Sequence, residues 1–228
     1  MKKVINYFSL YFRGREVGLD EEVGSAYLSQ LILLYFFAYL RGFFSGYRGS
    51  FLFKNCNIIC KNKVSLGKGT IINNNAKLNG MGKFGIVTGN NVAIGAYSQL
   101  IVSGSISDIG HGIEIGNNVG IGEFSYIGGA GLVTIGDDTI IGQYFSCHPE
   151  NHFFSDTSKL IRLQGVSRQG ISIGKNCWIG SKVTILDGAV IGDNTVIAAG
   201  SVVRGLFTNN VVLGGIPAKI IKVISDVK

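Results

Sequence analysis

Two histidines stand close together in the stretch CHPENHFFSD, which covers residues 147–156. His148 and His152 flank Glu150, and the chain has 3 histidines in all. Imidazole is the side chain that most readily accepts and returns a proton near neutral pH. A carboxylate can hold such a ring in one tautomer, and Glu150 or Glu123 could do so, although either could equally be an ordinary solvated carboxylate. The stretch is therefore a candidate site for proton transfer, although a histidine in a loop is by itself more often a solvated or structural residue.

The cysteines give a contrasting picture. Cys56, Cys60, Cys147 and Cys177 include no CxxC pair, and no Ser or Cys lies in a nucleophile motif. Cys147 and Cys177 occupy positions that point inward in the repeat described below, where a thiol acts as a small apolar residue. Without a nucleophile motif we expect no covalent enzyme intermediate. We recognise no cleavable signal peptide, so we expect a reduced, cytosolic protein.

The composition decides which elements carry these residues. The chain has 228 residues with 34 Gly and 2 Pro, and only 15% of the residues are charged. Glycine at twice its usual frequency disfavours a helical bundle, because each interior Gly costs about 1 kcal/mol of helix stability. A collagen triple helix needs Gly at every third position, which is not found. The composition favours a β-rich fold with many tight turns.

The net charge of +7 is compatible with nucleic acid, an anionic membrane surface or a phosphorylated ligand as a partner. The basic residues are spread along the chain, and no nucleic-acid-binding motif accompanies them. We therefore expect no nucleic-acid partner.

A six-residue repeat predicts the architecture. Large apolar residues recur at this spacing, and small residues follow each of them four positions later. A six-residue period would wander around a helix, whereas an even period keeps side chains on one face of a strand. Repetition of this kind is typical of a β-solenoid, whose coils bury their apolar columns on one another. The two columns are Ile173, Ile179, Ile185, Ile191, Ile197 and Val203, and Cys177, Val183, Ala189, Thr195 and Ser201.

This repeat resembles that of the hexapeptide-repeat acyltransferases, [LIV]-G-x-x-[STAV]-x, over roughly residues 55–222. The resemblance is closest to the sugar and polysaccharide O-acetyltransferases, including the galactoside and maltose enzymes. It implies an all-β solenoid, namely a left-handed parallel β-helix, that assembles as a homotrimer with active sites between subunits. It also implies acetyl-CoA as the acyl donor and a sugar hydroxyl as the acceptor, with a role in surface polysaccharide biosynthesis.

The resemblance also assigns roles to residues. It places the general base on His152, which activates the acceptor hydroxyl for direct attack on the thioester, and leaves His148 at a variable position. The segment NCWIGSKVTILDG resembles the coils that line the acetyl-CoA channel, with contacts at Ser181 and Ala199 and with Trp178 nearby. The Ser181 N–H would hold the oxyanion. The ending GGIPAKIIK places Lys219 and Lys222 at the CoA phosphates, and Arg204 replaces a lysine of the family pattern. The loop residues Arg162, Gln164 and Arg168 are expected near the acceptor.

Two regions depart from the repeat. Residues 1–50 are predicted as a helical segment, with a helix over Ser25–Leu40 after a basic, aromatic stretch. This segment either caps the solenoid or packs in the trimer, or it contacts the inner face of the cytoplasmic membrane. The remainder, 51–228, is predicted as the acyltransferase domain, with an active-site loop over 148–170 and a closing turn over 214–222. Long insertions of this kind cost little and commonly carry function.

Two other functions remain open. His111, His148 and His152 could form the three-histidine zinc site of a γ-class carbonic anhydrase, which shares this fold. The solenoid could also be a non-catalytic trimeric scaffold. For the acyltransferase itself we expect no bound metal.

Overall fold

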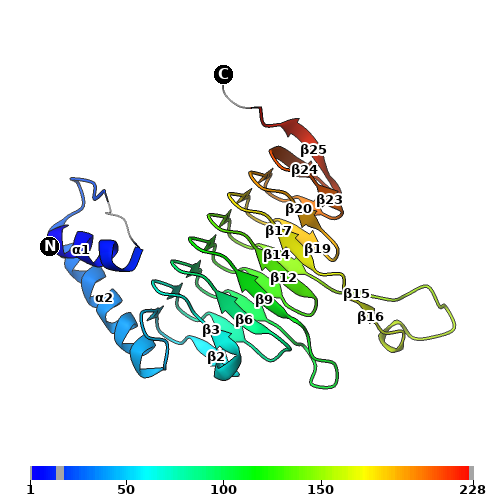
Figure 1. Cartoon of the computed structure of the whole chain (residues 1–228), viewed down its shortest axis with the longest axis horizontal. Helices are drawn as coiled ribbons and strands as arrows, with labels where there is room; N and C mark the ends of the chain where they lie inside the picture. The colour runs from blue at the N-terminus through cyan, green and yellow to red at the C-terminus, as the bar shows by residue number, and fades with distance from the viewer. Residues whose placement is uncertain (1, 14–17, 226–228) are drawn as a thin grey trace.

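The computed structural model describes residues 2–13 and 18–225, and it consists of two helices followed by a stack of β-coils (Figure 1). Helices α1 (Lys2–Arg13) and α2 (Ser25–Phe44) lie at one end of the stack, and the last strands lie at the other. The chain visits three parallel sheets in turn, so that every third strand belongs to the same sheet. Each side of a coil thus corresponds to one hexapeptide.

The three sheets are called A, B and C here, and two short 3-10 helices, η1 (Lys61–Lys63) and η2 (Ile161–Leu163), lie between strands. Sheet A contains β1 (Phe51–Leu52), β4 (Ile71–Ile72), β7 (Ala93–Ile94), β10 (Gly120–Ile121), β13 (Ile140–Ile141), β18 (Trp178–Ile179), β21 (Val196–Ile197), β24 (Val211–Gly215) and β25 (Ala218–Val223). Sheet B contains β2 (Asn57–Ile59), β5 (Lys77–Asn79), β8 (Gln99–Ile101), β11 (Tyr126–Gly128), β14 (Ser146–His148), β19 (Thr184–Leu186) and β22 (Val202–Val203). Sheet C contains β3 (Val64–Ser65), β6 (Gly85–Thr88), β9 (Gly112–Ile115), β12 (Leu132–Ile135), β17 (Ile171–Ile173), β20 (Val190–Ile191) and β23 (Leu206–Phe207).

The core lies inside the stack, where the predicted columns meet. In sheet A, Ile121 pairs with Ile94 on one side and with Ile141 on the other, and all three are buried. Both predicted columns are buried, and Cys147 and Cys177 are 0% and 1% exposed. Identical apolar residues therefore stack from coil to coil, which buries them without any second layer. Three parallel sheets visited in this order fit a left-handed β-helix, while the handedness itself stays a prediction.

The predicted helix in the first fifty residues is present, but α2 continues to Phe44 instead of ending at Leu40. The sequence Arg41-Gly42 reads as a helix end, yet both residues serve to attach the helix. Arg41 donates a hydrogen bond to the carbonyl oxygen of Leu52 at 3.0 Å. A Cβ atom at position 42 would clash with the carbonyl oxygen of Ser50, so only glycine allows this approach.

The inner side of α2 packs on the outer surface of sheet A at the first coils. Ala38 is fully buried against Phe51 and Ile71, and the rings of Tyr35 and Tyr39 pack on Phe51 at centroid distances of 5.6 and 5.8 Å. The side chains of the basic residues predicted for the preceding segment, at positions 2, 3, 13 and 15, lie outside the described part of the structure.

The predicted insertion leaves the stack between sheets B and C and projects away from it (Figure 1). Its base is a two-stranded antiparallel ladder of β15 (Asn151–His152) and β16 (Val166–Ser167). At the end of the chain, β24 and β25 form an antiparallel pair around Pro217, in place of a further coil.

Candidate active site

The loop ladder fixes the backbone of His152. In the ladder, His152 pairs with Val166 and Asn151 pairs with Ser167. The next residue, Phe153, donates its N–H to the carbonyl oxygen of Gly165 at 3.1 Å. The His152 side chain is exposed, and within the described residues it makes no side-chain hydrogen bond. Its imidazole is therefore free to meet a ligand or another chain.

His148 occupies a different setting, at the end of strand β14. One ring nitrogen, Nε2, is hydrogen-bonded to the Ser146 hydroxyl, and the ring stacks on Tyr126 with centroids 5.5 Å apart. Burial raises the pKa of Tyr126, and the nearby Glu150 carboxylate adds to this effect. Tyr126 consequently keeps its phenolic proton at neutral pH. His148 is thus held by its own sheet, whereas His152 is not.

Glu150 and Arg168 form an ion pair at the base of the loop. The Arg168 Nε donates to Glu150 Oε2 at 2.7 Å, and the same guanidinium makes two contacts of 2.9 Å with the Asp108 carboxylate. Although burial opposes the charge, the hydrogen bonds that Arg168 donates to both carboxylates, together with their negative charges, raise its pKa. Glu150 is one of the two carboxylates expected to be able to orient the imidazole, and Arg168 is expected near the acceptor, but in the structure the two side chains bind each other.

Asp187 is a second anchor of the loop, and the sequence analysis does not single it out. Its carboxylate is 9% exposed and accepts hydrogen bonds from the backbone N–H groups of Gln169 and Gly170, each at 2.9 Å. The Asn151 amide lies 3.5 Å from the other oxygen. One carboxylate thereby joins the two ends of the insertion. The sequence does contain a signal for this contact. Asp187 follows Gln169 by 18 residues, or three hexads, and this spacing places the two residues side by side on neighbouring coils.

Ser181 and Ala199, which are predicted to contact the acyl donor, lie at another corner, between sheets A and B. The backbone N–H groups of Ser181 and Ala199 donate no hydrogen bond within the described part of the chain. At the corner between sheets C and A, by contrast, carboxylate and amide side chains cap such groups, as Asp193 does for Lys175 N at 2.7 Å. Free N–H groups in one column are suited to the amide and thioester oxygens of a bound ligand.

Glu123 stands in this same column, with Gln143 between it and Ser181. The Ser181 hydroxyl donates to Gln143 Oε1 at 3.0 Å, which ties neighbouring coils together. Glu123 is therefore at the far end of a sheet B strand from the loop of its own chain. An interaction between Glu123 and an imidazole would need the His152 of another copy.

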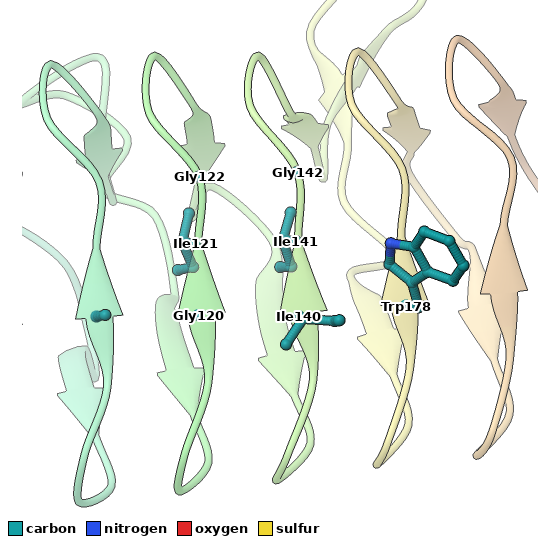
Figure 2. Close-up of a pocket in the computed structure, with 8 residues that line it drawn as sticks. Gly120, Ile121, Gly122, Ile140, Ile141, Gly142 and Trp178 are labelled. Atoms are coloured by element: carbon teal, nitrogen blue, oxygen red, sulfur yellow. The ribbon is translucent and has the colours of Figure 1, made fainter. Parts of the chain in front are cut away.

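A shallow apolar hollow lies on the outer surface of sheet A (Figure 2). Its volume is about 350 Å³, and it forms where Ala93 and Gly120 leave the sheet surface without large side chains. No atom lies within 4 Å of a Cβ built on Gly120. Trp178 and Ile140 border the hollow and are 57% and 55% exposed. This surface is unusually apolar for one that faces water.

The three predicted cations of the donor site are all exposed. Arg204 follows strand β22, while Lys219 and Lys222 lie on β25, where they pair with Gly214 and Val212. All three lie at the last coils, Arg204 at the corner between sheets B and C and the two lysines in sheet A.

The histidines do not gather in one chain. Among the described residues no three His, Cys, Asp or Glu side chains lie close enough together to hold a metal ion. The third histidine, His111, contacts the Lys83 ammonium through Nε2 at 3.3 Å and packs near Phe84. The three-histidine zinc site therefore has no counterpart within this part of the chain.

Comparisons with known proteins support the repeat architecture. Residues 170–205 match the family described as bacterial transferase hexapeptide (six repeats). The chain is 37% identical over 97 residues to WbbJ of Escherichia coli K12, whose name describes an O-acetyl transferase of lipopolysaccharide biosynthesis; the match covers 40% of this chain and 50% of WbbJ. It is 39% identical over 98 residues to galactoside O-acetyltransferase of the same organism, covering 41% of this chain and 45% of that protein.

The chain thus spans about half the length of the curated relatives it matches. A solved hexapeptide-repeat acetyltransferase of Vibrio cholerae O1 biovar eltor, in complex with acetyl coenzyme A, shares the fold with a TM-score of 0.53 at 24% identity. That likeness covers 62% of this chain and 72% of the other. Residues 170–205 therefore carry the hexapeptide repeat of the bacterial transferases.

Proposed function

We propose that this protein transfers an acetyl group from acetyl-CoA to a hydroxyl of a sugar in surface polysaccharide biosynthesis. The observation that carries the proposal is the column of unpaired N–H groups at Ser181 and Ala199 beside the exposed Trp178. The names of the two relatives, an O-acetyl transferase of lipopolysaccharide biosynthesis and a galactoside O-acetyltransferase, support the same reaction and acceptor class. The acetyl coenzyme A in the Vibrio structure supports the same donor.

In this proposal His152 is the general base. Its imidazole removes the proton of the acceptor hydroxyl as the oxygen attacks the thioester carbonyl carbon. The Ser181 N–H stabilises the oxyanion, the carbon–sulfur bond breaks, and the thiolate of CoA leaves and is protonated. A covalent intermediate on cysteine is disfavoured, because burial raises the pKa of Cys147 and Cys177 and keeps both thiols neutral.

The location of these groups supports a homotrimer with shared sites. His152 lies at the corner between sheets B and C, whereas Ser181 lies at the corner between sheets A and B. A strand of sheet B separates the two corners in every coil, so one chain cannot place both groups on one substrate. The apolar surface around Ile140 and Trp178 is suited to contact with a second copy.

The donor phosphates are assigned to Arg204, Lys219 and Lys222, which are exposed at the last coils. Exposed cations outside the corner that holds Ser181 fit a long carrier whose thioester reaches Ser181 while its phosphates remain outside. The proposal places the reaction in the cytoplasm, where acetyl-CoA is made and the thiols stay reduced.

The deciding experiment is an acetyl-CoA turnover assay over a panel of sugars and nucleotide sugars. We expect acetyl-CoA-dependent release of free thiol with one class of sugar, and a trimer by light scattering. A monomer near 24.4 kDa would contradict the shared site. Stoichiometric zinc in the purified protein would favour the carbonic anhydrase alternative. Lack of thermal stabilisation by acetyl-CoA would favour the scaffold.

A further inference from the structure

The outer side of α2 is an exposed apolar surface at the N-terminal end of the stack. The buried residues of this helix, among them Leu28, Ala38 and Gly42, lie on one side of it. By length and composition alone, α2 is also the one helix among the described residues that could cross a membrane. The opposite side carries Leu33, Phe36, Phe37, Phe43 and Phe44, which are 43–81% exposed.

Such a surface requires a partner, because soluble proteins rarely leave a contiguous apolar face of this size in water. The side that packs on sheet A is fully occupied by Tyr35, Ala38 and Tyr39. The polar residues on the outer side are confined to the first two turns, at Ser25, Ser29 and Gln30, since Arg41 reaches the Leu52 carbonyl oxygen. The helix is therefore apolar on both sides, and the protein covers just one of them.

Positive charge is in large excess in the segment that contains α2 and the first coils. Residues 23–107, which include α2 and the first coils, contain no Asp or Glu and eight cations. The cations are Arg41, Arg48, Lys54, Lys61, Lys63, Lys68, Lys77 and Lys83. The following residues, 108–225, contain eight cations and nine acids, so their sum is −1. The basic residues are spread along the chain, as the sequence analysis states, but the acidic residues that would neutralise them are not.

The apolar and cationic groups meet at the C-terminal end of α2. The Arg48 guanidinium lies over the Phe43 ring, 5.4 Å from its centroid. Arg48 and Lys61 both line a polar hollow of about 540 Å³ between the end of α2 and the first coil. Neither forms an ion pair within the described residues. The outer side of α2 together with Arg48 and Lys61 is called the docking face below.

We propose that the docking face binds the surface of an anionic phospholipid bilayer, with α2 lying in the interface and not across it. The apolar side chains enter the boundary between headgroups and acyl chains, and Arg48 and Lys61 contact lipid phosphates. The acidic residues Asp20, Glu21 and Glu22 precede the N-terminal end of α2, whereas Arg48 and Lys61 lie beyond its C-terminal end. Contact between the same cationic parts of two copies would be opposed by like-charge repulsion. The inner side of α2 stays on sheet A, held by Arg41 and Gly42.

This proposal deepens the proposed function, since it brings a sugar acetyltransferase to lipid-linked acceptors. In a cyclic trimer the three docking faces lie at the same height along the threefold axis, so they can bind one membrane together. Failure of the two proposals can be distinguished, because docking is measured without any acceptor and activity is measured with a soluble sugar.

The experiment is flotation of the full-length protein with vesicles of phosphatidylcholine alone or mixed with phosphatidylglycerol. We expect flotation with the mixed vesicles at low salt, release at high salt, and little binding to phosphatidylcholine. Arg48→Gln and Lys61→Gln should each weaken binding about fivefold, the equivalent of ~1 kcal/mol for each cation near an anionic surface. Phe37→Ser and Phe44→Ser should weaken binding to a similar or greater extent.

Two control variants keep these measurements specific. Lys175→Gln removes one positive charge far from the docking face, and Ile106→Ser removes an exposed apolar side chain from a distant loop; both should float like the wild type. Absence of flotation at low salt would overturn the proposal. So would salt-resistant binding insensitive to Arg48 and Lys61, which indicates a spanning helix. If the Phe37→Ser variant no longer forms a trimer, a second copy and not a membrane covers the docking face.

Discussion

The Arg168 guanidinium donates to the Glu150 carboxylate at 2.7 Å across the base of the loop that carries His152. The two side chains are 17% and 29% exposed, so water screens them only in part. Arg168 also forms an ion pair with Asp108, which belongs to a loop of an earlier coil. The pair thus connects the insertion to the body of the stack, two residues before the proposed base.

We expect Arg168→Ala to lower kcat by roughly 10- to 100-fold, because misplacement of a base by about 1 Å has effects of this size. The KM for acetyl-CoA should change little, since the donor corner is distant. A double-mutant cycle with Glu150→Gln should give a coupling of ~1–3 kcal/mol in unfolding free energy. If the two substitutions are additive, Arg168 acts on the acceptor and not through Glu150.

The two loop histidines should differ sharply in turnover. His152→Ala should reduce turnover by ~10²–10⁴-fold, the usual contribution of a positioned base, with acetyl-CoA binding nearly intact. His148→Ala should have a far smaller effect, because its ring is engaged with Ser146 and Tyr126. Calorimetric titration with acetyl-CoA and steady-state assays measure both. An inactive His148→Ala alongside an active His152→Ala would reverse the assignment.

The shared site predicts complementation between inactive variants. His152→Ala lacks the base, and Ser181→Pro lacks the N–H donor at the other corner. If the chains mix at random in equal amounts, about one quarter of sites combine an intact His152 with an intact Ser181 from different chains. Co-expression should therefore restore part of the activity, with Ala199→Pro as a second donor-corner variant. If trimers shown to contain both variants have no activity, the site does not lie between chains.

Asp187 should matter for the order of the loop. Asp187→Ala removes the acceptor of the Gln169 and Gly170 N–H groups, and a lost partner for a buried donor costs ~1–3 kcal/mol. We expect a lower unfolding free energy in urea and faster hydrogen exchange at Gly170. Asp193→Ala is a matched control, since it removes a similar cap at Lys175 N in another corner. Equal effects of both variants on turnover would show that Asp187 has no special role at the loop.

The buried thiols predict a fall in stability at alkaline pH. Burial raises the pKa of Cys147 above its ordinary value of 9.0 and that of Cys56 to about 11. Above pH 9 the unfolded chain loses these protons while the native chain keeps them, so the unfolding free energy decreases as pH rises. Each thiol contributes a slope of ~1.4 kcal/mol per pH unit. Cys147→Ala should show a correspondingly shallower fall between pH 9 and 11; an unchanged slope would contradict the buried, neutral thiol.

The sequence by itself determined the coil. A six-residue period with Ile at one place and a small residue four positions later satisfies local rules of strand alternation and turn geometry. These rules repeat identically in each hexad, so Ile179 and Val183 could be assigned to the core without any knowledge of distant contacts. The insertion after Cys147 and the helix from Ser25 were visible as interruptions of the same period.

Only the tertiary structure decided which groups meet. Arg168 finds Glu150, and Asp187 finds Gln169, because coils stack at a fixed rise and bring residues of different loops and coils side by side. His152 and Ser181 are likewise separated because they lie at different corners of the coil, one between sheets B and C and the other between sheets A and B. The uncovered side of α2 follows from its docking on sheet A, which selects one side of a helix that is apolar all round. A local pattern carries none of this information, since each contact joins segments that are independent in the unfolded chain.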